Sequence, residues 1–118
     1  MDLKISQMMQ MQKELFALHK EKWPPMEPEF GKDYILYMIE EIGEVISVIK
    51  KKGSTAIMEE PSVRHAFLSE MADVMMYYYD VLLRYHVTSD EISNIYLNKH
   101  NCNLNRDYDK EYREKYNG

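Results

Sequence analysis

Apolar residues recur every three to four positions along most of this chain, which is the period of an α-helix. The first apolar stripe covers residues 3–22. It predicts a helix that ends at Trp23, because the residue before a proline is disfavoured in helices. Residues 24–32 hold three prolines and a glycine, so we expect a connector there.

Two longer apolar stripes follow, on either side of a short break. The first predicts a helix from Asp33, as its N-cap, to about Lys52, with Gly53 as its stop. The second predicts a helix from Pro61, a residue favoured in the first turn, to about residue 86. Residues 54–60 are expected to form a short loop with room for a helical turn. The positions expected to face the core are Ile35, Met38, Ile39, Ile42, Val45, Ile46 and Ile49, then Val63, Phe67, Met71, Val74, Met75, Tyr78, Val81, Leu82 and Tyr85.

A fourth helix is predicted by residues 88–91, Thr-Ser-Asp-Glu, which have the pattern of a capping box. This helix is expected to begin near Ser89 and to fray at residues 100–105, where asparagine alternates with other residues. The charged tail, residues 107–118, is expected to form a loose last helix.

Four helices with short connections predict an all-α fold, a four-helix bundle that takes the whole chain, residues 1–118, as one domain. The two central helices carry further apolar residues outside their core stripes. These are Tyr37 and Val48 on one helix, and Ala66 and Tyr77 on the other. The excess indicates a second buried face, so we expect the bundle to oligomerise through apolar helix faces.

Composition and charge narrow the functional classes. The chain is 45% hydrophobic and 30% charged, which is ordinary for a soluble domain, and its formal net charge of −5 argues against a general nucleic-acid binder. The single cysteine, Cys102, excludes an internal disulfide and suits a reducing compartment. The N-terminal residues lack the apolar core of a signal peptide, and no apolar run is long enough to span a membrane. We therefore expect a cytoplasmic protein that binds neither nucleic acid nor membrane.

Two acidic pairs interrupt the central stripes: Glu41 with Glu44, and Glu70 with Asp73. Residues three apart lie on one face of a helix. Glu44 lies nine residues before Gly53 and Glu70 nine residues after Pro61, so an antiparallel hairpin would bring the pairs to the same height. Glu44 is then expected to face Glu70, and Glu41 to face Asp73, which makes a box of four carboxylates.

Four carboxylates in one place repel one another unless a cation lies between them. Oxygen ligands of this kind suit Mg²⁺, with Mn²⁺ as a substitute, and Mg²⁺ commonly binds substrate phosphates at the same time. Glu40 adjoins Glu41 but points about 100° away, which leaves either a supporting or a solvent-exposed role. The alternatives are solvated helix faces and a di-iron site. The di-iron site would want Glu-x-x-His, a spacing that none of the four histidines has.

Residues 39–45, Ile-Glu-Glu-Ile-Gly-Glu-Val, and 70–74, Glu-Met-Ala-Asp-Val, resemble the ExxE…ExxD signature of the MazG-like nucleoside triphosphate pyrophosphohydrolases. This all-α superfamily includes dimeric dUTPases and dCTP pyrophosphatases. A third element, Lys99 with Asn103 and Arg106, is similar to the Lys…Asn…Arg run that follows the fourth helix in that group. The resemblance covers roughly residues 33–108, which would be the core of the domain.

The resemblance implies Mg²⁺-dependent hydrolysis of a nucleoside triphosphate to the monophosphate and pyrophosphate, with a homodimer or a dimer of dimers as the active form. Glu41, Glu44, Glu70 and Asp73 would be the metal ligands, and one of them or Glu40 would help to deprotonate the attacking water. Lys99 and Arg106 would hold phosphate oxygens, and Asn103 would donate to a phosphate or sugar oxygen.

Base recognition is less defined. Trp23, Phe30, Tyr34 and Tyr37 lie just before or on the helix that carries Glu41, and an aromatic ring there could stack on a base. Trp23 is the first candidate, because it sits at a proline-rich bend, and Tyr37 is the second. Packing in the core or an interface is the alternative for each ring. At the level of the whole protein, the alternative is a non-catalytic helical module that dimerises and binds nucleotide as a sensor, and a plain structural bundle is a third option.

Overall fold

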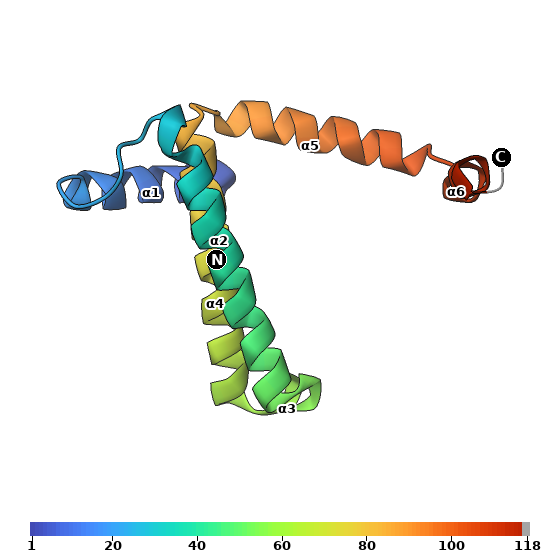
Figure 1. Ribbon diagram of the computed structural model, residues 1–118, viewed down its shortest axis with the longest axis horizontal. Coiled ribbons are helices and arrows are strands. Elements are labelled where there is room, and N and C mark those ends of the chain that lie inside the picture. The colour runs from blue at the N-terminus through green and yellow to red at the C-terminus, as the bar shows by residue number, and fades with distance from the viewer. Residues whose placement is uncertain (117–118) are drawn as a thin grey trace. The chain divides into compact units, whose positions relative to one another are not determined.

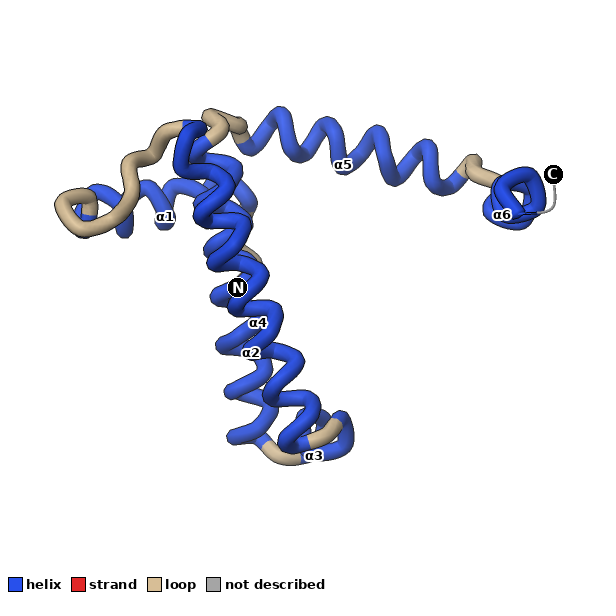
Figure 2. Tube along the Cα trace, viewed as in Figure 1, coloured by secondary structure: helices blue, strands red, loops and turns tan. Residues whose placement is uncertain are grey.

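The computed structural model describes residues 1–116, and every regular element in that range is helical (Figures 1 and 2). The predicted all-α class is therefore confirmed. The chain forms two compact units, Met1–Thr88 and Ser89–Gly118. Since the fourth predicted helix belongs to the second unit, the four-helix bundle and the single domain stay predictions. The elements are α1 (Ile5–His19), the 3-10 turn η1 (Pro28–Phe30), α2 (Gly31–Lys52), α3 (Ser54–Glu59), α4 (Pro61–Arg84), α5 (Ser89–Leu104) and α6 (Tyr108–Tyr116).

Helix α1 is shorter at both ends than the predicted 3–22. At its start the Lys4 backbone N–H donates to Gln7 Oε1 at 2.7 Å, which satisfies a donor that the helix leaves unpaired. At its end the backbone N–H groups of Lys22 and Trp23 both donate to the carbonyl oxygen of His19, at 2.9 and 3.1 Å. This turn closes the helix before the prolines are reached.

Helix α2 begins at Gly31, so the prediction of Asp33 as its N-cap was wrong. The η1 turn runs directly into the helix and makes Phe30 the cap residue, which leaves Asp33 in the first turn. A carboxylate is favourable there because it faces the positive end of the helix dipole. The predicted stop at Gly53 is confirmed, with a φ of 86° and a backbone N–H that donates to the Ile49 carbonyl at 2.9 Å.

The break between the two long helices is itself helical, since the predicted loop contains the short helix α3. Helix α4 starts at Pro61, as predicted. Helices α2 and α4 lie side by side as an antiparallel hairpin, and α1 packs on α4 at the end opposite α3 (Figure 1). A small buried cluster of Met9, Tyr79 and Leu83 joins α1 to α4, with Met26 packed against it.

Much of the predicted core stripe of the hairpin is exposed. Val45 is buried, but Ile42 and Ile46 are 41% and 51% exposed, and Met71 and Met75 are 44% and 48% exposed. Two helices that pack mainly on each other bury only one narrow stripe each, and α1 covers only one end. The expectation that all these positions face the core of this chain was therefore wrong.

In the second unit, α5 begins at Ser89 as predicted and continues to Leu104, through the stretch expected to fray. The predicted last helix is present as α6, which ends at Tyr116. The last two residues of the predicted tail, 117 and 118, lie outside the described residues. No helix within residues 1–116 combines the length and the apolar character that crossing a bilayer requires.

Two glycines of the hairpin, one at the end of α2 and one inside it, give a matched test of where this helix ends. Gly53→Ala is expected to lower the free energy of unfolding by about 1–3 kcal/mol, because its positive φ is strained for any residue with a Cβ. Gly43→Ala is expected to raise it by up to about 1 kcal/mol, because a Cβ there meets no atom within 4 Å and alanine favours helix. Urea unfolding followed by circular dichroism measures both, and equal effects of the two substitutions would contradict the assigned helix end.

Candidate metal centre and adjoining pocket

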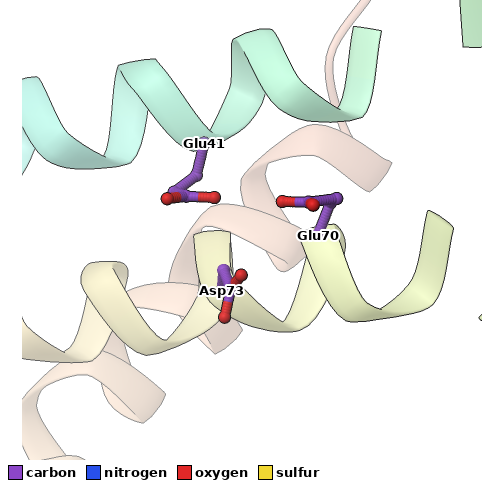
Figure 3. Close-up of side chains that lie close together, drawn as sticks. All are labelled: Glu41, Glu70 and Asp73. Atoms are coloured by element: carbon purple, nitrogen blue, oxygen red, sulfur yellow. The ribbon is translucent and has the colours of Figure 1, made fainter. Parts of the chain in front are cut away.

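The hairpin brings three carboxylates together near its middle. Glu41 projects from α2, and Glu70 and Asp73 project from α4 toward it (Figure 3). One oxygen from each residue can be chosen so that all three lie within 4.8 Å of one another. Three of the four predicted metal ligands therefore converge. A set of carboxylate oxygens at this spacing fits a hard cation such as Mg²⁺, which takes oxygen ligands and completes its shell with water or phosphate.

Glu44, the fourth predicted ligand, is not a member of this group. Positions three apart on a helix differ by about 60° around its axis, so the Glu44 side chain starts from a different direction than that of Glu41. Glu44 instead lines a hollow of about 320 Å³ nearer to α3, together with Lys51 and Ser62. Glu40 is exposed and also stands outside the cluster.

The cluster perturbs the acidity of its central member. Burial raises the pKa of the Glu41 carboxyl, and a hydrogen bond with Glu70 raises it further. The negative charges of Asp73, Glu70 and Glu44 act in the same direction. Each of these effects disfavours the ionised form of Glu41 in the metal-free protein, and a bound cation would remove the electrostatic part of that cost.

A pocket of about 460 Å³ adjoins the cluster, and Glu41 and Asp73 form part of its wall. Both predicted base-stacking residues, Trp23 and Tyr37, line this pocket, and so does Tyr77. The rings of Tyr37 and Tyr77 have centroids 5.9 Å apart. The Trp23 ring stacks on His19 at 4.7 Å, which gives it a fixed position next to the bend after α1. The remaining lining residues are Gln12, Leu15, Lys22, Pro24, Tyr34, Met76 and Asp80.

Behind the pocket lies a buried polar network centred on Arg84, which is 0% exposed. Its guanidinium lies 3.7 Å from Asp80 Oδ1, donates to the Pro24 carbonyl at 3.2 Å and stacks on the Tyr34 ring at 3.5 Å. Gln12 Nε2 donates to Asp80 Oδ1 at 3.2 Å. Burial raises the pKa of the Asp80 carboxyl, although the Gln12 hydrogen bond and the Arg84 charge act in the opposite direction.

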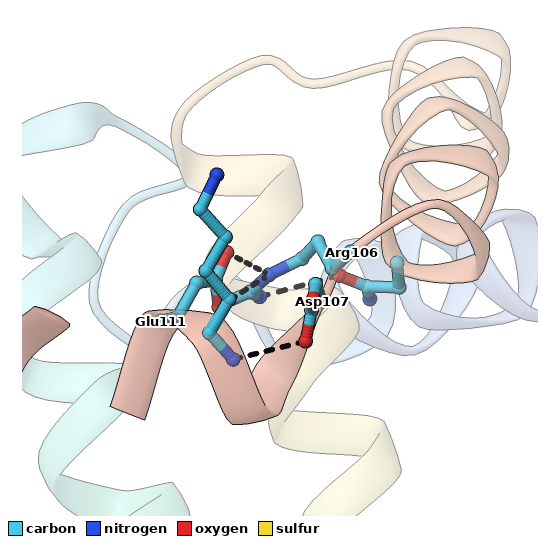
Figure 4. Close-up of polar contacts among 5 residues, drawn as sticks. Arg106, Asp107 and Glu111 are labelled. Carbon is cyan, nitrogen blue, oxygen red and sulfur yellow. Dashed lines mark hydrogen bonds and ion pairs between the residues drawn. The ribbon is translucent and has the colours of Figure 1, made fainter. Parts of the chain in front are cut away.

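The predicted phosphate ligands belong to the second unit and are described there by themselves. Lys99 and Asn103 line a hollow of about 250 Å³ on α5. Arg106 donates to Glu111, with its closest contact 2.6 Å from Nη2 to Oε2, and Asp107 caps α6 through the Lys110 backbone N–H (Figure 4). The guanidinium also lies 4.5 Å from the Tyr108 ring centroid.

The charged and amide side chains of the pocket wall that were not predicted as site residues are Gln12, Lys22 and Asp80. A signal for two of them was present in the sequence. Gln12 interrupts the apolar stripe of the first helix, and Asp80 is a carboxylate in an apolar stretch, as Glu41 and Asp73 are. Lys22 carried no such signal, because an exposed lysine near the end of a helix is common.

Comparison with known proteins identifies no relative, since no protein-family model, no curated protein and no solved structure matches the chain. The MazG-like resemblance therefore rests on the motif residues of the sequence alone.

Metal binding is testable by thermal unfolding. Saturating Mg²⁺ or Mn²⁺ is expected to raise the Tm of the intact chain, because a ligand of the native state alone stabilises it, by about 2.7 kcal/mol at roughly a hundred times its Kd. Glu41→Gln is expected to abolish this rise, since it removes the central ligand of the cluster. Glu40→Gln is the matched control that removes the same charge one residue away and keeps the response. A full metal response in Glu41→Gln would contradict the assigned site.

The raised pKa of Glu41 gives a pH dependence with a definite sign. Between its ordinary pKa of 4.5 and its higher folded value, the folded chain holds a proton that the unfolded chain has lost. Stability of the metal-free protein from this group is therefore present below pH 4.5 and is lost as the pH rises through the folded pKa. The Tm of Glu41→Gln is expected to match the wild type at low pH and to exceed it increasingly across this window in EDTA. A Tm difference that stays constant with pH would contradict the pKa shift.

Proposed function

We propose that this protein is an Mg²⁺-dependent nucleotide pyrophosphohydrolase of the MazG-like class, which cleaves a (d)NTP to the (d)NMP and pyrophosphate and so cleans the nucleotide pool. One observation carries the proposal: Glu41 and Asp73 belong both to the carboxylate cluster and to the wall of an aromatic pocket. A metal-bound triphosphate and a stacked base need this combination in adjacent places.

In this proposal Glu41, Glu70 and Asp73 hold the metal, and Glu44 joins them as the fourth ligand. The bound cation supplies neutralisation of the phosphate charge and acidification of a water molecule. Proton removal falls to a carboxylate that the metal does not neutralise, because a metal-bound carboxylate is a weak base. Glu40, which is exposed and adjoins Glu41, is assigned this role.

Two groups of residues are assigned to substrate binding, each within its own unit. Trp23 and Tyr37 would stack on the base, and Lys22 is the basic residue among those that line the pocket. Lys99, Asn103 and Arg106 keep the phosphate and sugar roles that the family resemblance implies. The proposal further includes the four-helix bundle, a cytoplasmic location and a homodimer or dimer of dimers. In such an oligomer the exposed Ile42, Ile46, Met71 and Met75 would be covered.

Pyrophosphate release from a panel of NTPs and dNTPs with Mg²⁺ tests the activity directly. We expect release from at least one nucleotide. We also expect Glu41→Gln, Glu70→Gln and Asp73→Asn each to lower kcat/KM on the order of a hundredfold or more, because metal and water activation are lost together. Glu59→Gln on α3 removes a carboxylate with no assigned role and is expected to retain wild-type turnover.

Folding of each variant is checked by circular dichroism. If a folded wild-type protein releases pyrophosphate from no nucleotide, the hydrolase proposal is wrong. Nucleotide binding without turnover would instead identify the non-catalytic sensor module.

A further inference from the structure

The pocket contains two buried polar side chains for which the proposed hydrolysis has no use. Gln12 on α1 and Asp80 on α4 are each only 6% exposed, yet both line the pocket beside the aromatic rings. Burying an amide and a carboxylate is costly unless their hydrogen bonds are made. Any hydrogen-bonding atom of these two side chains that lacks a partner in the protein therefore favours a ligand that supplies one.

The contacts of this pair define which hydrogen bonds it still lacks. Gln12 Nε2 donates to Asp80 Oδ1, which turns the amide so that its NH₂ group faces the carboxylate. Arg84 lies on the same Oδ1, and its Nη1 donates to the Asp80 backbone carbonyl. Gln12 Oε1 and Asp80 Oδ2 remain, and both are acceptors without a donor among the described residues. Neither oxygen is fully enclosed. Among residues 1–116, the fully enclosed side-chain atom that lacks a hydrogen-bond partner is Arg84 Nε, not one of these two oxygens.

A wall with two free acceptors is selective for a ligand that presents donors. An exocyclic amino group donates to such oxygens, whereas a keto oxygen in the same position faces them with its own lone pairs and leaves them unpaired. At position 4 cytosine carries an amino group and uracil a keto oxygen, and the adjacent N3 is an acceptor in cytosine but an N–H donor in uracil. Adenine and hypoxanthine differ in the same way at position 6 and N1, so the keto bases offer one donor at the ring where the amino bases offer two at the exocyclic position. The two oxygens can therefore discriminate between bases of the same shape.

We propose that Gln12 and Asp80 read the edge of the base and select amino-bearing bases, cytosine or adenine, over their keto counterparts, uracil and hypoxanthine. This assignment rests on the proposed function, in that the ligand is a nucleotide, and it names the substrate class of the same site. Burial raises the pKa of the Asp80 carboxyl, which agrees with this assignment. The donors around the carboxylate do not fully offset the cost of burying its charge. A purely structural network would show no preference between the paired bases.

Trp23 makes binding measurable without turnover, because it is the single tryptophan of the chain and it lines the pocket. The intact protein with Mg²⁺ is titrated with dCMP and dUMP, and in a second pair with dAMP and dIMP, and quenching of Trp23 fluorescence gives each Kd. The amino member of each pair is expected to bind at least about tenfold more tightly. Equal Kd values, tighter binding of the keto member, or no binding of any of the four would overturn the proposal.

A matched pair of substitutions assigns the effect to a residue. Asp80→Asn places an NH₂ donor beside the base, so we expect it to abolish or reverse the preference for dCMP over dUMP. Asp33→Asn makes the same chemical change in the first turn of α2, at a residue that does not line the pocket, and is expected to keep the preference. If Asp80→Asn does not fold, Gln12→Met removes the other acceptor with little change in volume and is expected to reduce the preference. A preference that survives in a folded Asp80→Asn, or in Gln12→Met, would refute the assignment.

Pyrophosphate release from dCTP and dUTP keeps the two proposals separate. Turnover of both nucleotides at equal kcat/KM would support the hydrolase and overturn base reading by Gln12 and Asp80. Selective binding of dCMP without pyrophosphate release from any nucleotide of the panel would do the reverse, because the pocket would read the amino group in a protein that is not a hydrolase.

Discussion

The buried guanidinium of Arg84 is the interaction on which the shape of the pocket depends. It contacts the Phe16 ring of α1 at 5.5 Å, the Pro24 carbonyl of the following bend, the Tyr34 ring of α2 and the Asp80 carboxylate of its own helix. A buried charge is tolerated only when its surroundings compensate it, and removal of one partner from such a network typically costs about 3–5 kcal/mol. Trp23, Tyr34 and Asp80 therefore meet in one pocket because the segments that carry them meet at Arg84.

The carboxylate cluster has the opposite energetic effect from this network. It brings like charges together, whereas the Arg84 network pairs opposite charges. Arg84 compensates the charge of Asp80. The charges that act on Glu41 are those of Asp73, Glu70 and Glu44, and both these charges and its burial disfavour ionisation. Folding of the metal-free chain thus gathers carboxylates that would be more stable apart. Local conflict of this kind is common where a protein keeps a functional site, because a ligand resolves it. A cation between Glu41, Glu70 and Asp73 would be such a ligand.

Local sequence signals predicted the hairpin and the height of the cluster. Gly53 marks the end of α2 and Pro61 the start of α4, and the helical rise per residue then places the carboxylates along each helix. The place of Glu44 was not predictable from height alone, because it depends on how far each helix is rotated about its axis. Asp33 was predicted as the N-cap of α2. The η1 turn, which begins at Pro28, instead makes Phe30 the cap residue. The exposed Ile42 and Met75 show a further limit: periodicity identifies an apolar face but not what covers it.

The charges of the pocket bear on how a nucleotide triphosphate could enter it. Lys22 is the basic residue among those that line it, against the carboxylates of Glu41, Asp73 and Asp80, so the wall repels a bare polyphosphate. A triphosphate that carries Mg²⁺ keeps a net negative charge but is repelled less, and the cation itself is attracted by the carboxylates. The contact of Arg106 with Glu111 does not argue against a phosphate role for Arg106. Both side chains are 46% exposed, and an ion pair between exposed side chains is screened by water and contributes little to stability. In the proposed phosphate role of Arg106, a triphosphate would compete with Glu111 for the guanidinium, because it carries more negative charge than one carboxylate.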